Sequence, residues 1–236
     1  MLRPAQWQLS PSSALILTSW ELVLSLWSTG HTIGLEPATM LATDEEVCQM
    51  ARIIILTGDA AETLEVFYPL HRLQEAGFEV HIAAPEKKKL QFVVHDFVDG
   101  FDTYTEKPGH CWDADIAFKD VNPDDYVAAV VPGGRAPEYI RNNADAKRIV
   151  RAMFDRNVPV AATCHGPLLL AAADVLKGRS SSAYPELAID VEVAGGVFED
   201  GGAVVDGNLV SARAWPDNGT WMGQFIKNLE AAGITA

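Results

Sequence analysis

From residue 52 onward, short β-branched apolar runs alternate with helical patterns, and this alternation limits the possible folds more than any other feature. Strands are predicted over residues 52–57, 80–84, 126–131 and 158–163, and helices over residues 62–76, 144–156, 167–176 and about 217–232. Such alternation is typical of a parallel sheet with helices on both faces. The sequence therefore predicts an α/β fold with a doubly wound sheet.

Two segments depart from this regular pattern. Between residues 90 and 118 the sequence breaks into short extended pieces with Gly, Asp and Pro, which predicts an excursion that carries a hairpin. Asp206-Gly207-Asn208 has the composition of a tight hairpin turn, so two short strands are expected around it.

Residues 1–49 differ from the rest of the chain, because they contain no lysine and an apolar stretch over residues 14–27. This stretch is shorter than a bilayer span and contains Glu21, which argues against both a spanning helix and a secretory signal. We predict an N-terminal extension over residues 1–49 and one domain over residues 50–236. The extension is a loosely attached or artefactual segment, an extra docked helix or a targeting segment.

The composition is that of a folded protein with a full hydrophobic core, since 48% of the 236 residues are hydrophobic and 21% are charged. A net charge of -14 repels phosphate backbones and anionic lipid surfaces, so neither nucleic acid nor a membrane is expected as a partner. The three cysteines are odd in number and lack zinc-site spacing, so we expect no disulfide scaffold and no metal. Reduced thiols favour a cytoplasmic location.

A cysteine stands where a buried strand runs into a helix, in the segment Ala161-Ala162-Thr163-Cys164-His165-Gly166-Pro167. Ligands of open α/β sheets bind at such strand ends. The helix start and its unpaired N–H groups favour a thiolate, so the sequence predicts a lowered pKa and a reactive sulfur. His165 would move the proton, and Gly166 would leave room for a substrate. The alternative is a small buried apolar residue.

Two other strand ends carry candidate groups. Glu62 follows the first strand, where it either caps the helix or holds the Cys164 sulfur as a proton acceptor or donor. Gly133 and Gly134 follow the strand at residues 126–131, and their backbone N–H groups suit an oxyanion, the alternative being an ordinary turn. His110 in the irregular segment is a further candidate for the site.

The order of the histidines excludes two enzyme classes. Apart from the adjacent His165, no histidine follows Cys164 in the chain. An α/β-hydrolase keeps its base after the nucleophile, and a class I glutamine amidotransferase needs a late histidine, so both classes are disfavoured.

The chain resembles the DJ-1/PfpI superfamily over residues 52–229. The markers are Glu62, Ala162-Thr163-Cys164-His165-Gly166-Pro167, Ala183-Tyr184-Pro185 and the run Pro132-Gly133-Gly134-Arg135-Ala136-Pro137-Glu138. Residues 95–110 resemble the plant DJ-1-like glyoxalases and their bacterial relatives in particular. The chain departs from the family pattern in two places. Ala60, Ala61 and Thr63 replace larger or acidic residues, which leaves Asp59 and Glu65 as rivals to Glu62, and Leu168 stands where relatives often have Gln, which makes the pocket rim more apolar.

This resemblance implies a flavodoxin-like three-layer sandwich with a mostly parallel central sheet. It implies Cys164 as nucleophile, Glu62 beside it, His165 as the adjacent base and an oxyanion site at the N–H groups of Gly134 and His165. Arg135 would belong to the same substrate-binding segment. The family's oligomers further imply that Glu138 reaches the Cys-His pair of a neighbouring subunit, so a dimer, trimer or hexamer with the site near an interface is expected.

Three functions follow from the resemblance as hypotheses. The first is a glyoxalase or deglycase that acts on small 2-oxoaldehydes such as methylglyoxal without glutathione, metal or organic cofactor. The second is an intracellular cysteine peptidase that is active as an oligomer. The third is a thiol redox sensor or a chaperone-like protein in which Cys164 is oxidised but turns nothing over.

Overall fold

The computed structural model describes residues 50–236, so the predicted extension over residues 1–49 lies outside the described residues. Within residues 50–236 no helix is long and apolar enough to cross a bilayer. In the same part of the chain, no three His, Cys, Asp or Glu side chains gather as they would around a metal ion.

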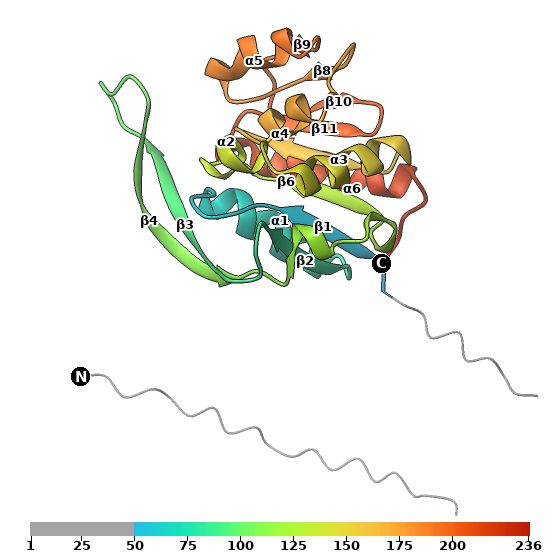
Figure 1. Ribbon diagram of the computed structural model, residues 1–236. Helices are drawn as coiled ribbons and strands as arrows, with labels where there is room; N and C mark the ends of the chain where they lie inside the picture. The colour runs from blue at the N-terminus through green and yellow to red at the C-terminus, as the bar shows by residue number, and fades with distance from the viewer. Residues whose placement is uncertain (1–49) are drawn as a thin grey trace, which may run out of the picture. The chain divides into compact units, whose positions relative to one another are not determined.

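The centre of the domain is a seven-stranded sheet in the order β10-β11-β7-β6-β1-β2-β5 (Figure 1). Adjacent strands of this sheet are parallel, except β10 and β11, which are antiparallel and form the predicted hairpin around Gly207. The bounds are β1 Arg52–Leu56, β2 Glu79–Ala84, β5 Ile116–Ala117, β6 Ala128–Val131, β7 Val160–Thr163, β10 Val204–Asp206 and β11 Leu209–Ala212. Strands β6 and β7 are buried throughout, as strands covered on both faces must be.

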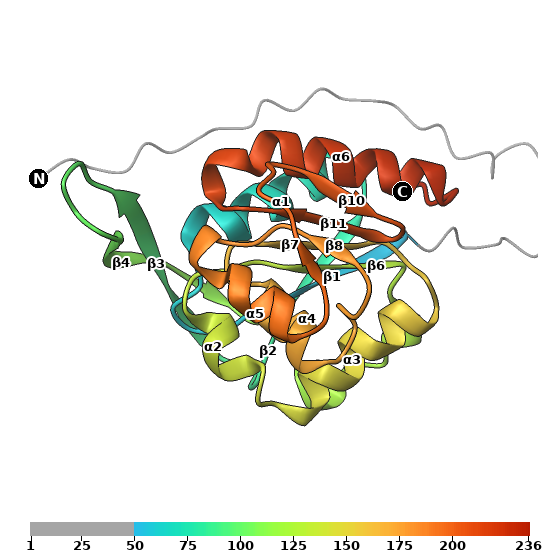
Figure 2. The ribbon, with the colours of Figure 1, turned by 90° about the horizontal axis from the view of Figure 1, so that it is seen from above.

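Helices cover both faces of this sheet (Figure 2). One face carries α1 (Thr63–Glu75) and α6 (Asn218–Ala231), and Trp221 and Phe225 of α6 are completely buried against it. The other face carries α2 (Ala136–Ile140), α3 (Ala144–Asp155), α4 (Pro167–Ala172) and α5 (Ala188–Val193). Four 3-10 turns lie at Phe118–Asp120, Pro123–Asp125, Pro185–Leu187 and Trp215–Asp217, and a small parallel pair is formed by β8 (Ser180–Ser181) and β9 (Val197–Phe198).

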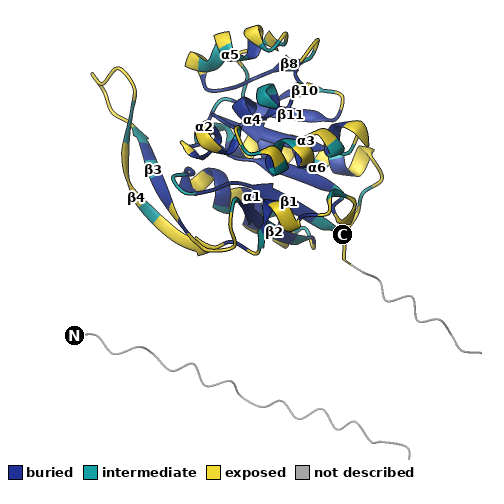
Figure 3. Cartoon of the chain, in the orientation of Figure 1, coloured by how far each residue is buried: buried dark blue, intermediate teal, exposed yellow. Residues whose placement is uncertain are grey.

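The irregular segment forms the predicted hairpin as a long antiparallel ribbon of β3 (Lys89–Phe97) and β4 (Tyr104–Asp113). This β3–β4 ribbon is separate from the central sheet and extends along one side of the domain (Figure 1). Leu90, Phe92 and His95 of β3 are buried, whereas β4 is largely exposed (Figure 3). The ribbon therefore presents one face of β3 to the domain and leaves its tip in solvent.

The helix predicted over residues 167–176 is shorter in the structure, because α4 ends at Ala172. Asp174 has a left-handed φ of 59°. The N–H of Val175 bonds to the carbonyl of Leu170 at 3.3 Å, and the N–H of Asp174 bonds to that of Ala171 at 3.0 Å. These two bonds make a Schellman ending, which stops the helix with an Asp where glycine is more usual.

Candidate active site

Cys164 lies on a sharp turn between β7 and α4. Its φ of 56° is left-handed, an uncommon conformation for a residue with a side chain, and costs roughly 1–2 kcal/mol. The turn is held by the N–H of Cys164, which bonds to the Ala212 carbonyl at 3.2 Å, and by the N–H of Gly166, which bonds to the Thr163 carbonyl at 2.7 Å. The side chain is only 4% exposed. Backbone hydrogen bonds thus fix the direction of the sulfur.

The carboxyl group beside this sulfur is that of Glu65, and the prediction for Glu62 is wrong. Glu65 is completely buried and hydrogen-bonds to Cys164. Its Oε2 accepts the N–H of Gly133 at 2.8 Å, and its Oε1 accepts the N–H of Trp215 at 3.0 Å. Helix geometry explains the exchange: residue 62 is the N-cap of α1, whereas residue 65 is the third residue of the helix and projects from its first turn.

Glu62 is instead the N-cap of α1, as the alternative interpretation had it. Its Oε2 accepts the N–H of Glu65 at 2.8 Å. Burial raises the pKa of Glu62 to about 7, and the backbone N–H groups of Glu65, Leu64 and His95 oppose that rise. Because residue 62 also forms a β-bridge with Val93 of β3, it joins the start of α1 to the β3–β4 ribbon.

Asp59, the other rival carboxylate, lies elsewhere. It is partly exposed, where it accepts a hydrogen bond from the Lys88 ammonium at 2.6 Å and from the N–H of Gln91 at 2.9 Å. Asp59 therefore anchors the beginning of the ribbon and is not the carboxylate beside the sulfur.

The predicted fall in the pKa of Cys164 is also wrong. Burial and the neighbouring Glu65 raise the pKa of the Cys164 thiol well above its usual range. The N–H groups of Gly134 and His165 hydrogen-bond to the sulfur and lower that pKa by less. Burial, and after it the charge of Glu62, raises the pKa of Glu65 to about 8, whereas the hydrogen bonds with the N–H of Gly133 and with Cys164 lower it by less. The sulfur and the carboxyl therefore hold their protons at neutral pH.

The glycines of the site are required for close packing. A Cβ at Gly133 would stand 2.5 Å from the Cβ of Cys164, and Gly134 has a left-handed φ of 71°. The N–H of Gly133 is engaged by Glu65, so Gly134 and His165 supply the N–H groups that face the sulfur. A Cβ at Gly166 would lie 2.2 Å from the carbonyl oxygen of Val131, so this glycine serves strand-to-turn packing and not substrate access.

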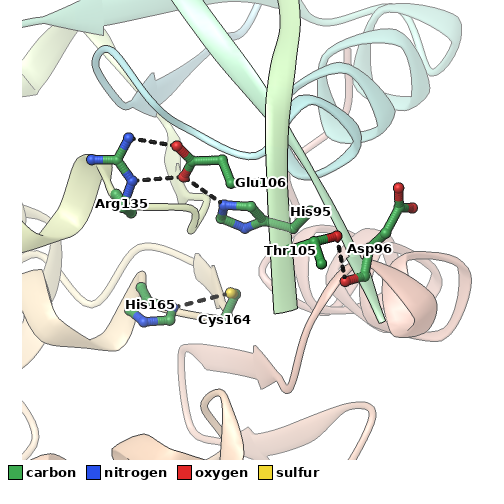
Figure 4. Close-up of polar contacts among 7 residues, drawn as sticks. All are labelled: His95, Asp96, Thr105, Glu106, Arg135, Cys164 and His165. Carbon is green, nitrogen blue, oxygen red and sulfur yellow. Dashed lines mark hydrogen bonds and ion pairs between the residues drawn. The ribbon is translucent and has the colours of Figure 1, made fainter. Parts of the chain in front are cut away.

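His165 lies directly against the sulfur, with 3.3 Å between its Nδ1 and the Sγ of Cys164 (Figure 4). The ring stacks on Tyr184 at 5.5 Å and meets the edge of Tyr104 at 5.9 Å. Burial, assisted by His95, lowers the pKa of His165 to about 4. The imidazole is therefore neutral at physiological pH and able to accept a proton.

Hydrogen-bonded side chains connect the ribbon to the segment before α2, close to Cys164 and His165 (Figure 4). Arg135 donates two hydrogen bonds to Glu106, at 2.6 and 2.7 Å, and Glu106 lies 3.1 Å from His95 Nε2. His95 is 4% exposed and packs 4.2 Å from the ring of Tyr104. The Arg135 guanidinium thus binds Glu106, and its role in substrate binding stays a prediction.

His110 does not reach the site, so this prediction is wrong as well. It lies near the base of the ribbon and meets the ring of Phe67 of α1 at 5.7 Å. His95 and Tyr104 take the place expected for it, and our interpretation of the sequence missed both. The signal available was the hairpin pairing itself, since His95 pairs with Glu106 and faces the domain.

Glu138 is exposed in the first turn of α2. An exposed carboxylate is compatible with a contact to a neighbouring subunit, but a single chain does not test that contact. Its role in a neighbouring Cys-His pair stays a prediction.

A sequence model of the DJ-1/PfpI family matches residues 51–228. The chain belongs to the DJ-1/PfpI family. A deglycase of Thermococcus kodakarensis is 42% identical over 178 residues, which are 75% of this chain and 99% of that relative. Protein DJ-1 homolog D of Arabidopsis thaliana is 41% identical over 182 residues, which are 74% of this chain and 47% of the plant protein. The predicted family is therefore confirmed.

Solved structures agree with this assignment. A two-domain protein of Anabaena variabilis with DJ-1/ThiJ/PfpI-like and ferritin-like domains has a TM-score of 0.65 at 28% identity, over 78% of this chain and 48% of that one. DJ-1 of Schizosaccharomyces pombe has a TM-score of 0.60 at 16% identity, over 77% of this chain and 91% of that one, and shows the fold alone. The flavodoxin-like sandwich with a mostly parallel sheet is confirmed.

Proposed function

We propose that the protein is a cysteine-dependent enzyme of the deglycase or glyoxalase type, which acts on small 2-oxoaldehydes such as methylglyoxal without glutathione. One observation carries the proposal. The Cys164 sulfur faces the N–H groups of Gly134 and His165, lies 3.3 Å from a neutral imidazole and hydrogen-bonds to a carboxyl group whose pKa is about 8. The relatives named deglycases support the same class at 42% identity.

The first step is the addition of the thiol to the aldehyde carbon. As the sulfur–carbon bond forms, the thiol proton passes to His165 and the carbonyl electrons move to the aldehyde oxygen. The N–H groups of Gly134 and His165, which face the sulfur, would stabilise this oxyanion. His165 then returns the proton to the oxygen, giving a hemithioacetal on Cys164.

The second step moves a hydrogen between neighbouring carbons. With a pKa of about 8, a fraction of Glu65 is ionised near neutral pH, and this carboxylate takes the proton from the former aldehyde carbon, so that the adjacent ketone becomes an enediolate. The carboxyl returns that proton to the former ketone carbon, while the hydroxyl proton of the hemithioacetal moves to the former ketone oxygen and the carbon bound to sulfur becomes a carbonyl. The product is a thioester of a 2-hydroxy acid on Cys164. Water hydrolyses it, so methylglyoxal and one water give lactate, and the thiol is regenerated without any oxidant.

The test is the formation of lactate from methylglyoxal in the absence of glutathione. Cys164→Ala should abolish it, whereas Cys111→Ala is a matched control, because Cys111 is exposed on β4. A Cys164→Ala variant that retains full activity would end the proposal.

Deglycation is measured separately, as the release of a free thiol or amine from its methylglyoxal adduct. Because buffers with a primary amine compete for free methylglyoxal, the adduct assay is run in phosphate and in an amine buffer. A rate of release that follows the buffer and not the enzyme concentration would exclude deglycation while leaving the glyoxalase reaction intact.

The burial of the sulfur favours this function over the two alternatives. A side chain that is 4% exposed under Tyr104 and Tyr184 suits a small aldehyde better than a polypeptide. A thiol with a raised pKa is a slow target for peroxide, because the thiolate is the species that reacts. A cytoplasmic location and a homo-oligomer remain part of the proposal, and sedimentation of the purified protein tests the latter.

A further inference from the structure

A cavity of about 300 Å³ adjoins the candidate active site. Its walls come from the end of β3, from the segment after β8 and from the turn before α6, and include Phe97, Tyr184, Pro185, Ala214 and Pro216. This volume is at the lower end of the range of small-molecule sites. The mechanism above does not use it.

The cavity begins one side chain away from the sulfur. Tyr184 and Ala214, which line it, also form one buried cluster with Cys164. The N–H of Tyr184 bonds to the Cys164 carbonyl at 3.0 Å, which fixes the tyrosine relative to the nucleophile. Tyr184 and Ala214 are thus shared between the surroundings of the sulfur and the walls of the cavity.

The walls favour an apolar or aromatic group. Phe97 stacks near Tyr184 at 6.5 Å and near Trp215 at 6.0 Å, with interplanar angles of 13° and 23°. The cation at the cavity, Arg213, is already bound by Asp217 at 2.8 and 2.9 Å and by Asp200 at 3.2 Å. The cavity thus offers aromatic faces and no uncompensated positive charge.

We propose that this cavity receives the substituent of the 2-oxoaldehyde, and that the enzyme prefers an aromatic or large apolar substituent to a methyl group. This inference rests on the proposed function. In the hemithioacetal the sulfur binds the former aldehyde carbon and the substituent is attached to the next carbon, so the first atom of the substituent is three bonds from the sulfur. A methyl group leaves most of the cavity empty, whereas a phenyl ring meets Phe97 and Tyr184.

The experiment compares kcat/KM for the conversion of phenylglyoxal to mandelate and of methylglyoxal to lactate. Wild-type protein, Phe97→Ala, Phe97→Leu and Phe101→Ala are assayed together. Phe101 is the matched control, since it is 58% exposed against 51% for Phe97 and does not line the cavity. We expect a phenylglyoxal preference of about tenfold in the wild type. It should fall at least fivefold in Phe97→Ala, less in Phe97→Leu and not in Phe101→Ala.

The outcomes separate this inference from the function on which it rests. Turnover of methylglyoxal with no phenylglyoxal preference, or with the same preference in Phe97→Ala, overturns the inference and leaves the function standing. Turnover of neither aldehyde overturns the function. A readout without turnover is calorimetric titration of Cys164→Ala with mandelate and lactate; tighter binding of mandelate, lost on adding Phe97→Ala, supports the cavity, and equal binding overturns it.

Discussion

Cys164 and His95 belong to the same site but are held in place by different kinds of interaction. The cysteine is fixed by the backbone, through a left-handed turn, two turn hydrogen bonds and glycines that admit no Cβ. The histidine lies on a ribbon outside the central sheet, and its ring is held by side chains, through Glu106 and Arg135. The comparison shows that the reacting groups are held at the edge of the sheet, whereas the access of water to them and the charges around them depend on the ribbon.

The largest expected effect concerns the sheet edge. Glu65→Gln should lower kcat/KM for methylglyoxal by 100-fold or more, at about the lower limit of what a general acid or base contributes. Glu62→Gln is the matched control, because glutamine can still cap α1, and we expect less than about a tenfold loss. Steady-state lactate formation measures both. A loss larger than tenfold from Glu62→Gln would assign the catalytic role to Glu62, which the structure places at the N-cap and not beside the sulfur.

The next effect concerns the ribbon. His95→Gln removes one of the causes that lower the pKa of His165 and lets water reach the ring, so that pKa rises from about 4 toward its usual 6.5. A base that is protonated at higher pH loses activity earlier on acidification. We expect roughly a tenfold fall in kcat/KM near pH 5.5 and less than about a threefold change at pH 8.

The groups that face the His165 ring are Cys164, Tyr104 and Tyr184, and none of them is altered in His95→Gln. The profile of kcat/KM from pH 4.5 to 8.5 gives the answer. An acidic limb that stays in place while the melting temperature falls would assign His95 a structural role only.

A third prediction uses stability in place of activity. The folded-state pKa of Glu65 is raised to about 8, so its stabilising contribution is complete below the unfolded value of 4.5 and is lost as pH rises through 8. Glu62, with a pKa of about 7, acts in the same direction at lower pH, and His165 acts in the opposite direction only between about pH 4 and 6.5. Between pH 7 and 8 the wild type should lose about 1 kcal/mol of unfolding free energy.

Glu65→Gln should lose most of this slope, whatever its absolute stability, because glutamine does not titrate and only the smaller contribution of Glu62 remains. Urea unfolding at pH 7 and pH 8 measures the two slopes. Equal slopes in the wild type and the variant would show that Glu65 does not titrate in this range.

The smallest effect is expected on the outer face of the ribbon. Lys107 pairs with Asp96 at 2.9 Å, and both side chains are exposed. Lys107→Gln should change stability by less than about 0.5 kcal/mol and leave the pH profile in place. Thermal unfolding and the same lactate assay check this. A change as large as that of His95→Gln would mean that any charge on the ribbon shifts the pH profile, and not only the buried contacts of His95.

The sequence predicted the fold better than the site, because strands and helices follow from patterns of neighbouring residues, whereas the site depends on contacts between residues that are far apart in the chain. The apolar composition of β6 and β7 is enough to predict that both strands are buried. The turn that carries Cys164 is also predicted locally, because a strand is followed directly by a helix. Which of Glu62 and Glu65 faces the sulfur depends on where α1 begins within one turn, and local patterns define helix starts poorly.

The contribution of the ribbon could not be predicted at all from local patterns. The contact between His95 and the site needs the register of β3 and β4 and the bend that lays the ribbon against the domain. The raised pKa of Cys164 has the same origin, since a short turn with N–H groups predicts a lowered value, and the opposing burial comes from residues such as Ala214 and Tyr184 that are distant in sequence.

The attachment of the ribbon has a consequence for how such a protein can change. Its tip, residues 98–103, carries no contact to the nucleophile, while the lower part is tied to the domain by Glu106, Arg135 and the bridge at Glu62. The tip can therefore be exchanged for a loop of different length or polarity while thiol chemistry is preserved. Changes at these six consecutive positions can therefore accumulate without loss of the reaction, whereas a new substrate range requires changes in the walls of the cavity, such as Phe97.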